Sequence, residues 1–160
     1  MQGASDSPHY VVLGLPVYIR FLSYKGSPED VARAYQGLPE ECRDRTIIAA
    51  LPGEPVTLCE AVTSFIHALD SRFRGSRVRS LSILFIMELL GYRQVRDVVD
   101  NVRTADYLIA ASTENSCFEE AVRLVSSIEG VGEPIGVEEC DFEGLSRRVV
   151  SSVRRGVRLE

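Results

Sequence analysis

Histidine is scarce in this chain, and lysine is scarcer still. The 160 residues include two histidines, His9 and His67, and one lysine, Lys25. Nucleophilic catalysis requires a base within hydrogen-bond reach of the nucleophile. His9 lies near the amino terminus, before the first predicted strand. His67 has apolar neighbours within a helical pattern, and we interpret His67 as a helix-surface or boundary residue. Cys59 is about two helical turns from His67, too far along one helix to form a catalytic pair.

The cysteines lack any close spacing. Cys42, Cys59, Cys117 and Cys140 are far apart in the sequence, so neither a zinc knuckle nor a CxxC redox motif is indicated. Free cysteine is among the most buried residue types. We therefore expect four isolated thiols in or near the core.

Long apolar runs are also missing. The longest, residues 83–90, is interrupted by Glu88 and is much shorter than the ~20 residues that a membrane-spanning helix needs. The first ten residues contain no basic segment followed by an apolar stretch, which a secretion signal would require. We expect no membrane partner and a cytoplasmic location.

Nucleotide-binding motifs are lacking as well. Residues 51–54 have neither the lysine nor the hydroxyl that completes a phosphate loop, and the glycines at 130–136 follow a helical pattern, which indicates turns. We predict no enzymatic activity and no cofactor. Two alternatives stay open: a small cysteine-dependent hydrolase that uses Cys59 or Cys117, and a homo-oligomeric module that binds a small anion.

The sequence does contain a regular series of strand and helix patterns. β-Branched and apolar segments predict strands at 10–22 (broken at Gly14 and Pro16), 46–51, 107–111 and 134–137. Apolar residues at helical spacing predict helices at 28–37, 58–73, 80–90, 95–102, 116–128 and 141–157. The expected caps are Ser27, Ser80 or Ser82, a capping box of Ser116 with Glu119, and Asp141. The predicted fold is α+β or mixed α/β, one domain spanning 1–160 with one small sheet packed with several helices, and residues 1–8 flexible.

Charge is distributed unevenly along a chain whose net charge is −5. Residues 72–103 hold seven arginines against three acids, whereas residues 104–144 hold ten acids against Arg123 alone. Residues 147–158 add five further arginines. A concentrated basic region in an acidic chain indicates an anionic partner such as RNA, and the acidic region could face a basic protein. A solvated surface with scattered ion pairs explains the same charges equally well.

One stretch resembles a known family. Residues 79–95 read RSLSILFIMELLGYRQV, a helix that opens with Ser-Leu, continues as an apolar run and ends in Gly-x-Arg-Gln-Val ahead of a short valine-rich helix. This pattern, with the element order over residues 47–139, resembles the PRPK-binding protein, the smallest common subunit of the KEOPS tRNA-modification complex. Many relatives carry an acid early in the apolar helix, where this chain has Leu84.

The resemblance implies a non-catalytic accessory subunit in the formation of threonylcarbamoyladenosine in tRNA. Its expected partners are a PRPK-type kinase/ATPase, tRNA and, indirectly, the other KEOPS subunits. Archaeal relatives are thought to hold the single-stranded 3′ end of tRNA, which would give the arginines a role. The expected RNA-binding residues are Arg72, Arg74, Arg77, Arg79, Arg93 and Arg96.

Arg93 has a structural alternative, and so does the neighbouring Tyr92, which we consider as a further RNA contact. Arg93 could instead bond the carbonyl groups that end the preceding helix. Tyr92 could provide a stacking platform for a base or could be buried against the same helix end.

Overall fold

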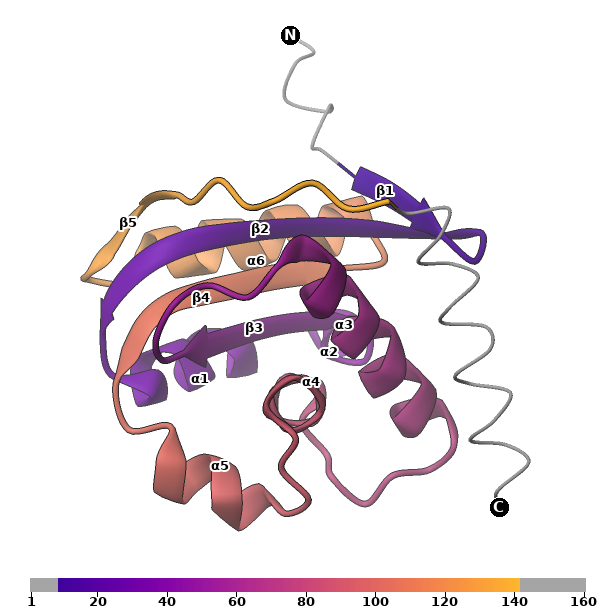
Figure 1. The fold of residues 1–160 in the computed structure, drawn as a ribbon, viewed down its shortest axis with the longest axis horizontal. Coiled ribbons are helices and arrows are strands. Elements are labelled where there is room, and N and C mark those ends of the chain that lie inside the picture. Colours follow the sequence, from indigo (N-terminus) through magenta and orange to yellow (C-terminus); the bar gives the residue numbers. More distant parts are fainter. Residues whose placement is uncertain (1–8, 142–160) are drawn as a thin grey trace, which may run out of the picture.

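A computed structural model describes residues 9–141, which form one antiparallel sheet with helices on both faces (Figure 1). The long strand β2 (Leu15–Gly26) pairs along one edge with β4 (Ala105–Ser112), and β4 pairs in turn with β3 (Thr46–Leu51). The other edge of β2 pairs first with β1 (His9–Val12) and further along with β5 (Val131–Pro134). The predicted α+β class with one small sheet is confirmed.

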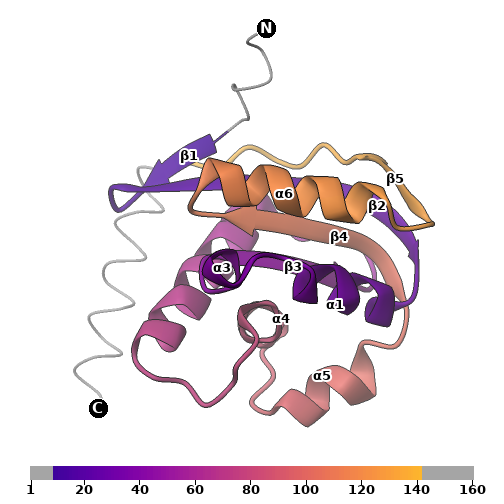
Figure 2. The same cartoon turned by 180° about the vertical axis from the view of Figure 1, so that it is seen from behind.

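Alternation along the central strands divides the core between the two faces of the sheet. In β3, Ile47 and Leu51 face one apolar cluster, while Ile48 and Ala50 face the other. The first cluster is covered by α3 (Leu58–Phe73), α4 (Leu81–Leu90) and α5 (Val95–Asn101). The second is covered by α1 (Pro28–Gln36), α2 (Glu40–Arg43) and α6 (Asn115–Ser126), seen from behind in Figure 2. The fold is therefore a three-layer sandwich.

Local signals place most of these elements correctly. The Ser27 side chain caps α1 by accepting from the Glu29 amide, and Pro28 takes the first helical position. The Ser80 hydroxyl caps α4 by accepting from the Ile83 amide. Residues 46–51 form a strand and 58–73 a helix, both with the predicted bounds. No pattern predicted the four-residue helix α2.

Two predictions near the end of the described chain are wrong. Helix α6 begins at Asn115 after Glu114, so Ser116 lies inside the helix and forms no capping box with Glu119; Ser116 instead donates to the Glu114 carboxylate. The last strand is Val131–Pro134 and not 134–137. After the Ile135 amide donates to the Phe21 carbonyl the ladder stops, because β1 already occupies the next part of the β2 edge. The helix predicted for 141–157 lies outside the described residues.

None of the helices between residues 9 and 141 is both long enough and apolar enough to cross a membrane.

Candidate nucleic-acid interface

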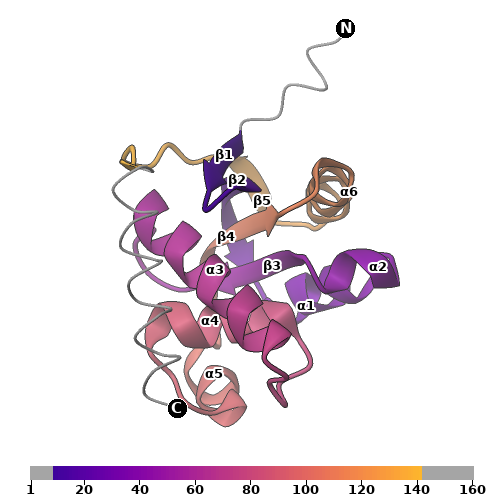
Figure 3. The ribbon, with the colours of Figure 1, turned by 90° about the vertical axis from the view of Figure 1, so that its right-hand side faces the viewer.

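The six predicted RNA-binding arginines lie at the two ends of α4. Arg72 and Arg74 end α3, Arg77 and Arg79 lie in the connection to α4, and Arg93 and Arg96 follow α4. A ten-residue helix spans about 15 Å, so α4 separates the arginines into two groups. The 74–80 connection and α5 both lie beyond the β3 edge of the sheet, on the side of the molecule opposite β5 (Figures 1 and 3).

The arginines at the end of α3 are engaged with acidic residues. Arg72 forms an ion pair of 2.6 Å with Asp44 and also donates to the backbone carbonyl of Arg79. Arg74 forms an ion pair of 2.9 Å with Asp70 one helical turn earlier. The Arg72 side chain thus holds the 74–80 connection against the end of α3, and a phosphate would have to compete with a carboxylate for both arginines.

Arg77 and Arg79 are different, because both are exposed and neither side chain forms an ion pair with any residue of 9–141. Gly75, at φ +87°, turns the chain after α3, in the left-handed conformation that glycine adopts without strain. The connection therefore presents two guanidinium groups to solvent.

A polar depression of about 500 Å³ lies beside this connection. Its charged lining consists of Arg43, Arg72 and Arg79 with Glu40 and Asp44. The Tyr35 hydroxyl closes one side by donating to the Arg43 carbonyl at 2.7 Å and accepting from the Leu81 amide at 3.3 Å. Burial raises the pKa of Tyr35 above its ordinary value. The sequence patterns did not identify Arg43, because α2, which carries it, was not predicted.

The second group of arginines follows the end of α4. Gly91 adopts a left-handed conformation, and the amides of Gly91 and Tyr92 both donate to the Met87 carbonyl. This backbone arrangement ends the helix without Arg93, whose side chain forms no hydrogen bond with residues 9–141, so its predicted capping alternative is wrong. Arg93 and Arg96 are exposed, and Tyr92 is half-buried against the core.

The charge separation along the sequence is also a separation in space. The acids after residue 104 lie mainly on α6, on β5 and in the segment that follows it, on the side of the molecule away from α4 and α5 (Figure 1). Several of these acids pair locally, as Glu120 does with Arg123. Arg77, Arg79, Arg93 and Arg96 lie on the side of the molecule away from these acids, where Glu88 of α4 and Asp97 and Asp100 of α5 are the neighbouring acids in sequence.

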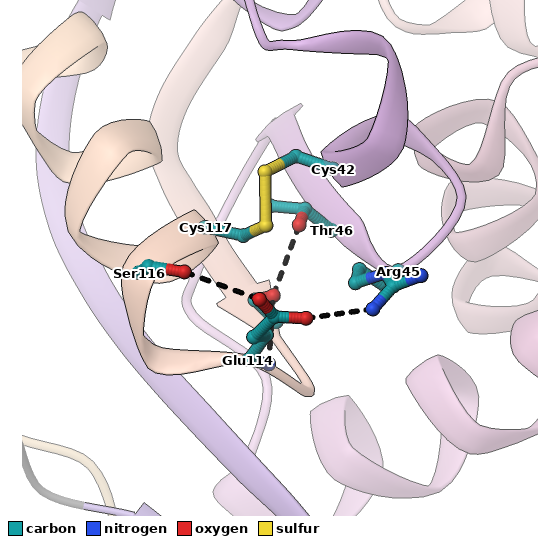
Figure 4. The surroundings of a disulfide bond; sticks show 7 residues. Cys42, Arg45, Thr46, Glu114, Ser116 and Cys117 are labelled. Carbon is teal, nitrogen blue, oxygen red and sulfur yellow. Dashed lines mark hydrogen bonds and ion pairs between the residues drawn. A yellow bond between two sulfur atoms is a disulfide. The ribbon is translucent and has the colours of Figure 1, made fainter.

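The prediction of four free thiols is wrong. Cys42 of α2 and Cys117 of α6 form a buried disulfide, with Cα atoms 5.5 Å apart (Figure 4). Cys59 of α3 forms a second disulfide with Cys140, with Cα atoms 5.3 Å apart. Both pairs are more than 70 residues apart in sequence, and only the packing of helices and strands brings them within bonding range. In this form neither Cys59 nor Cys117 offers a thiolate for the hydrolase alternative.

No protein-family model matches this chain, and no curated protein matches it in sequence.

Proposed function

We propose that this protein is a non-catalytic accessory subunit of a KEOPS-type complex that binds tRNA and docks on a PRPK-type kinase/ATPase. The support is the Gly91–Val95 motif in its sequence context, together with the exposed arginines on both ends of α4. The observation that carries the RNA assignment is that Arg77, Arg79, Arg93 and Arg96 are exposed and form no ion pair with residues 9–141, while the acids after residue 104 lie mainly on the other side of the molecule. Arg72 and Arg74, held by acids, are proposed to position the connection.

The RNA assignment is tested with two double variants of equal charge change. Arg77→Glu/Arg79→Glu reverses two exposed arginines, and the control Arg33→Glu/Arg123→Glu reverses two exposed arginines on α1 and α6, across the sheet. We expect the first variant alone to weaken tRNA binding and to flatten its salt dependence, because each single-strand phosphate contact contributes roughly −0.7 to the log–log slope. Both variants should stay folded, since exposed ion pairs contribute about 0–1 kcal/mol.

Preference for the tRNA end is measured in the same titration. Intact tRNA and tRNA truncated at its single-stranded 3′ end are compared at two salt concentrations, with Tyr92 as a proposed stacking residue. Equal affinity for the two RNAs would remove the end-recognition claim. Equal weakening of tRNA binding by the two double variants would contradict the assignment of Arg77 and Arg79 as RNA-binding residues.

Docking on the kinase is a separate part of the proposal. Mixing the chain with a purified PRPK-type ATPase at micromolar concentration should give a one-to-one complex on gel filtration, and two unshifted peaks would contradict it. The arginine-lined depression favours one second candidate, a homo-oligomeric module for a small anion. That candidate predicts an oligomer on gel filtration and binding of inorganic phosphate without RNA.

The proposed cytoplasmic location has to be consistent with two disulfides, which form in an oxidising compartment. Most cytosols keep thiols reduced, but the intracellular proteins of hyperthermophilic archaea are disulfide-rich. We therefore propose an archaeal source of that kind, in which a cytoplasmic tRNA-modification subunit could keep both bonds.

A further inference from the structure

An apolar groove opens at the outer edge of the sheet, beside β3. It has a volume of about 600 Å³, within the range of ligand-binding clefts. Three helices form its walls, with Val31 of α1, Ile86 of α4 and Val98 of α5 among the lining side chains. In Figures 1 and 2 these helices surround the free edge of β3, the last strand of the sheet.

The floor of the groove is strand backbone. The Ile48 amide donates to the Ser82 hydroxyl at 3.0 Å, so the backbone at Ile48 faces away from β4, and its amide is satisfied by α4. Hydrogen-bonding direction alternates along an antiparallel strand. Ala50, two residues further, therefore directs its amide and carbonyl to the same outer side, where it lines the groove.

Within residues 9–141, no side chain bonds the Ala50 amide or carbonyl in the way that Ser82 bonds the Ile48 amide. No turn, loop or side-chain hydrogen bond within residues 9–141 involves Ala50, which is 4% exposed. A buried amide or carbonyl without a partner costs free energy comparable to a lost hydrogen bond. Backbone groups that stay unpaired at a sheet edge are a template for one more strand, and the groove is where this edge can be reached.

We propose that the groove binds an extended peptide segment of a partner protein, which pairs its backbone with Ala50 and places small apolar side chains against α1, α4 and α5. An amide-bearing backbone fits because the floor offers one donor and one acceptor, while the walls are apolar. The groove has two charged lining residues of opposite sign, Glu29 and Arg103, which favours a segment without net charge. This proposal does not depend on RNA binding.

The test uses the full chain, labelled for amide NMR, and a panel of capped tripeptides. Each has the form acetyl-Xaa-Ala-Xaa-N-methylamide, where Xaa is Val, Leu or Phe. We expect the Ala50 amide resonance to move on titration, with at least one peptide binding in the millimolar range. The matching peptide with an N-methylated central alanine should bind roughly three- to tenfold more weakly, because it loses one backbone hydrogen bond.

Two exposed valines of α5 provide a matched pair of variants. Val99 lines the groove and is 65% exposed, whereas Val95 is 41% exposed and does not line it. Val99→Trp should obstruct the groove and weaken binding at least tenfold, and Val95→Trp should leave it unchanged. Both substitutions replace surface residues, so both proteins should keep the amide spectrum of the folded chain.

Three results would overturn the proposal. They are an unmoved Ala50 resonance with every peptide at about 10 mM, equal binding of the N-methylated peptide, and equal binding by Val99→Trp. The experiment contains no RNA, so its failure would not affect the tRNA proposal, and the arginine variants would not affect peptide binding.

Discussion

At the scale of single residues, Asp106 connects three segments that are distant in sequence. One carboxylate oxygen accepts from the Lys25 ammonium at 2.5 Å, at the end of β2, and the other accepts from the Gly53 amide at 2.6 Å, in the turn after β3. The hydrogen bond from Lys25, followed by that from Gly53, lowers the pKa of Asp106 below its ordinary value. Because Asp106 follows Ala105 at the start of β4, it links the ends of three adjacent strands.

This geometry gives a pH-dependent prediction. A carboxyl group whose pKa is lower in the folded than in the unfolded state stabilises the fold above its unfolded pKa, and the contribution disappears as the pH falls through the folded pKa. Asp106→Asn should therefore lower the melting temperature at pH 7 and have a progressively smaller effect below pH 4. Glu54→Gln, an exposed acid in the same turn, serves as the control and should have little effect at either pH. A pH-independent loss in Asp106→Asn would contradict the role of the charge.

At the scale of elements, α4 has two functions that its apolar sequence does not reveal. It buries Leu81, Leu84 and Phe85 in the core, as a helix surrounded by protein should. It also covers the edge of β3 at Ile48, since the Ser82 hydroxyl, 6% exposed, satisfies the Ile48 amide. Edge strands invite pairing with other chains, and covering them with a helix is one of the ways proteins prevent it.

Removing this hydroxyl tests the edge contact. Ser82→Ala leaves a buried amide without a partner and should reduce the free energy of unfolding by roughly 1–3 kcal/mol, measured by urea denaturation. Ser64→Ala, which alters a similarly buried serine of α3, should cost less. Equal losses in the two variants would show that the bond to Ile48 contributes nothing specific.

At the scale of the whole molecule, the two disulfides join distant parts of the chain. Cys42–Cys117 links α2 to α6 on one face of the sheet, and Cys59–Cys140 links α3 to the segment after β5. The bonds close 75- and 81-residue separations, so loop-closure entropy alone predicts nearly equal contributions. The first bond is buried, and its removal should also cost packing.

We expect Cys59→Ala/Cys140→Ala to reduce the free energy of unfolding by about 2–4 kcal/mol. Cys42→Ala/Cys117→Ala should reduce it by at least as much, because the buried bond also contributes packing. Denaturation with and without reductant measures both, and mass spectrometry after alkylation of the unreduced, unfolded protein should find no modified cysteine. Four alkylated thiols in that sample would contradict the pairing. Reductant should have no further effect on a variant that lacks all four cysteines.

The sequence by itself determined the elements whose signals are local. Periodicity and caps lie within a few residues of the structure they specify, so 46–51 and 58–73 were predicted with their observed bounds, and Ser27 and Ser80 cap the predicted helices. The uneven charge is read directly from the sequence, and a polar, glycine-containing connection between two helices is expected to face solvent, as Arg77 and Arg79 do. Tertiary structure was needed wherever the partner is distant in the chain.

Residues that are distant in the sequence determine which side chains of the candidate site are already engaged in ion pairs or disulfides. Arg72 meets Asp44, 28 residues away, and Glu114 meets Arg45, 69 residues away, at the start of α6 where a capping box was predicted. The same reason underlies the disulfides, the early end of β5 and the open edge at Ala50, since each depends on which strands and helices become neighbours. Local sequence fixes secondary structure because its interactions are short in sequence, whereas ion pairs, disulfides and grooves are fixed only when folding brings remote residues together.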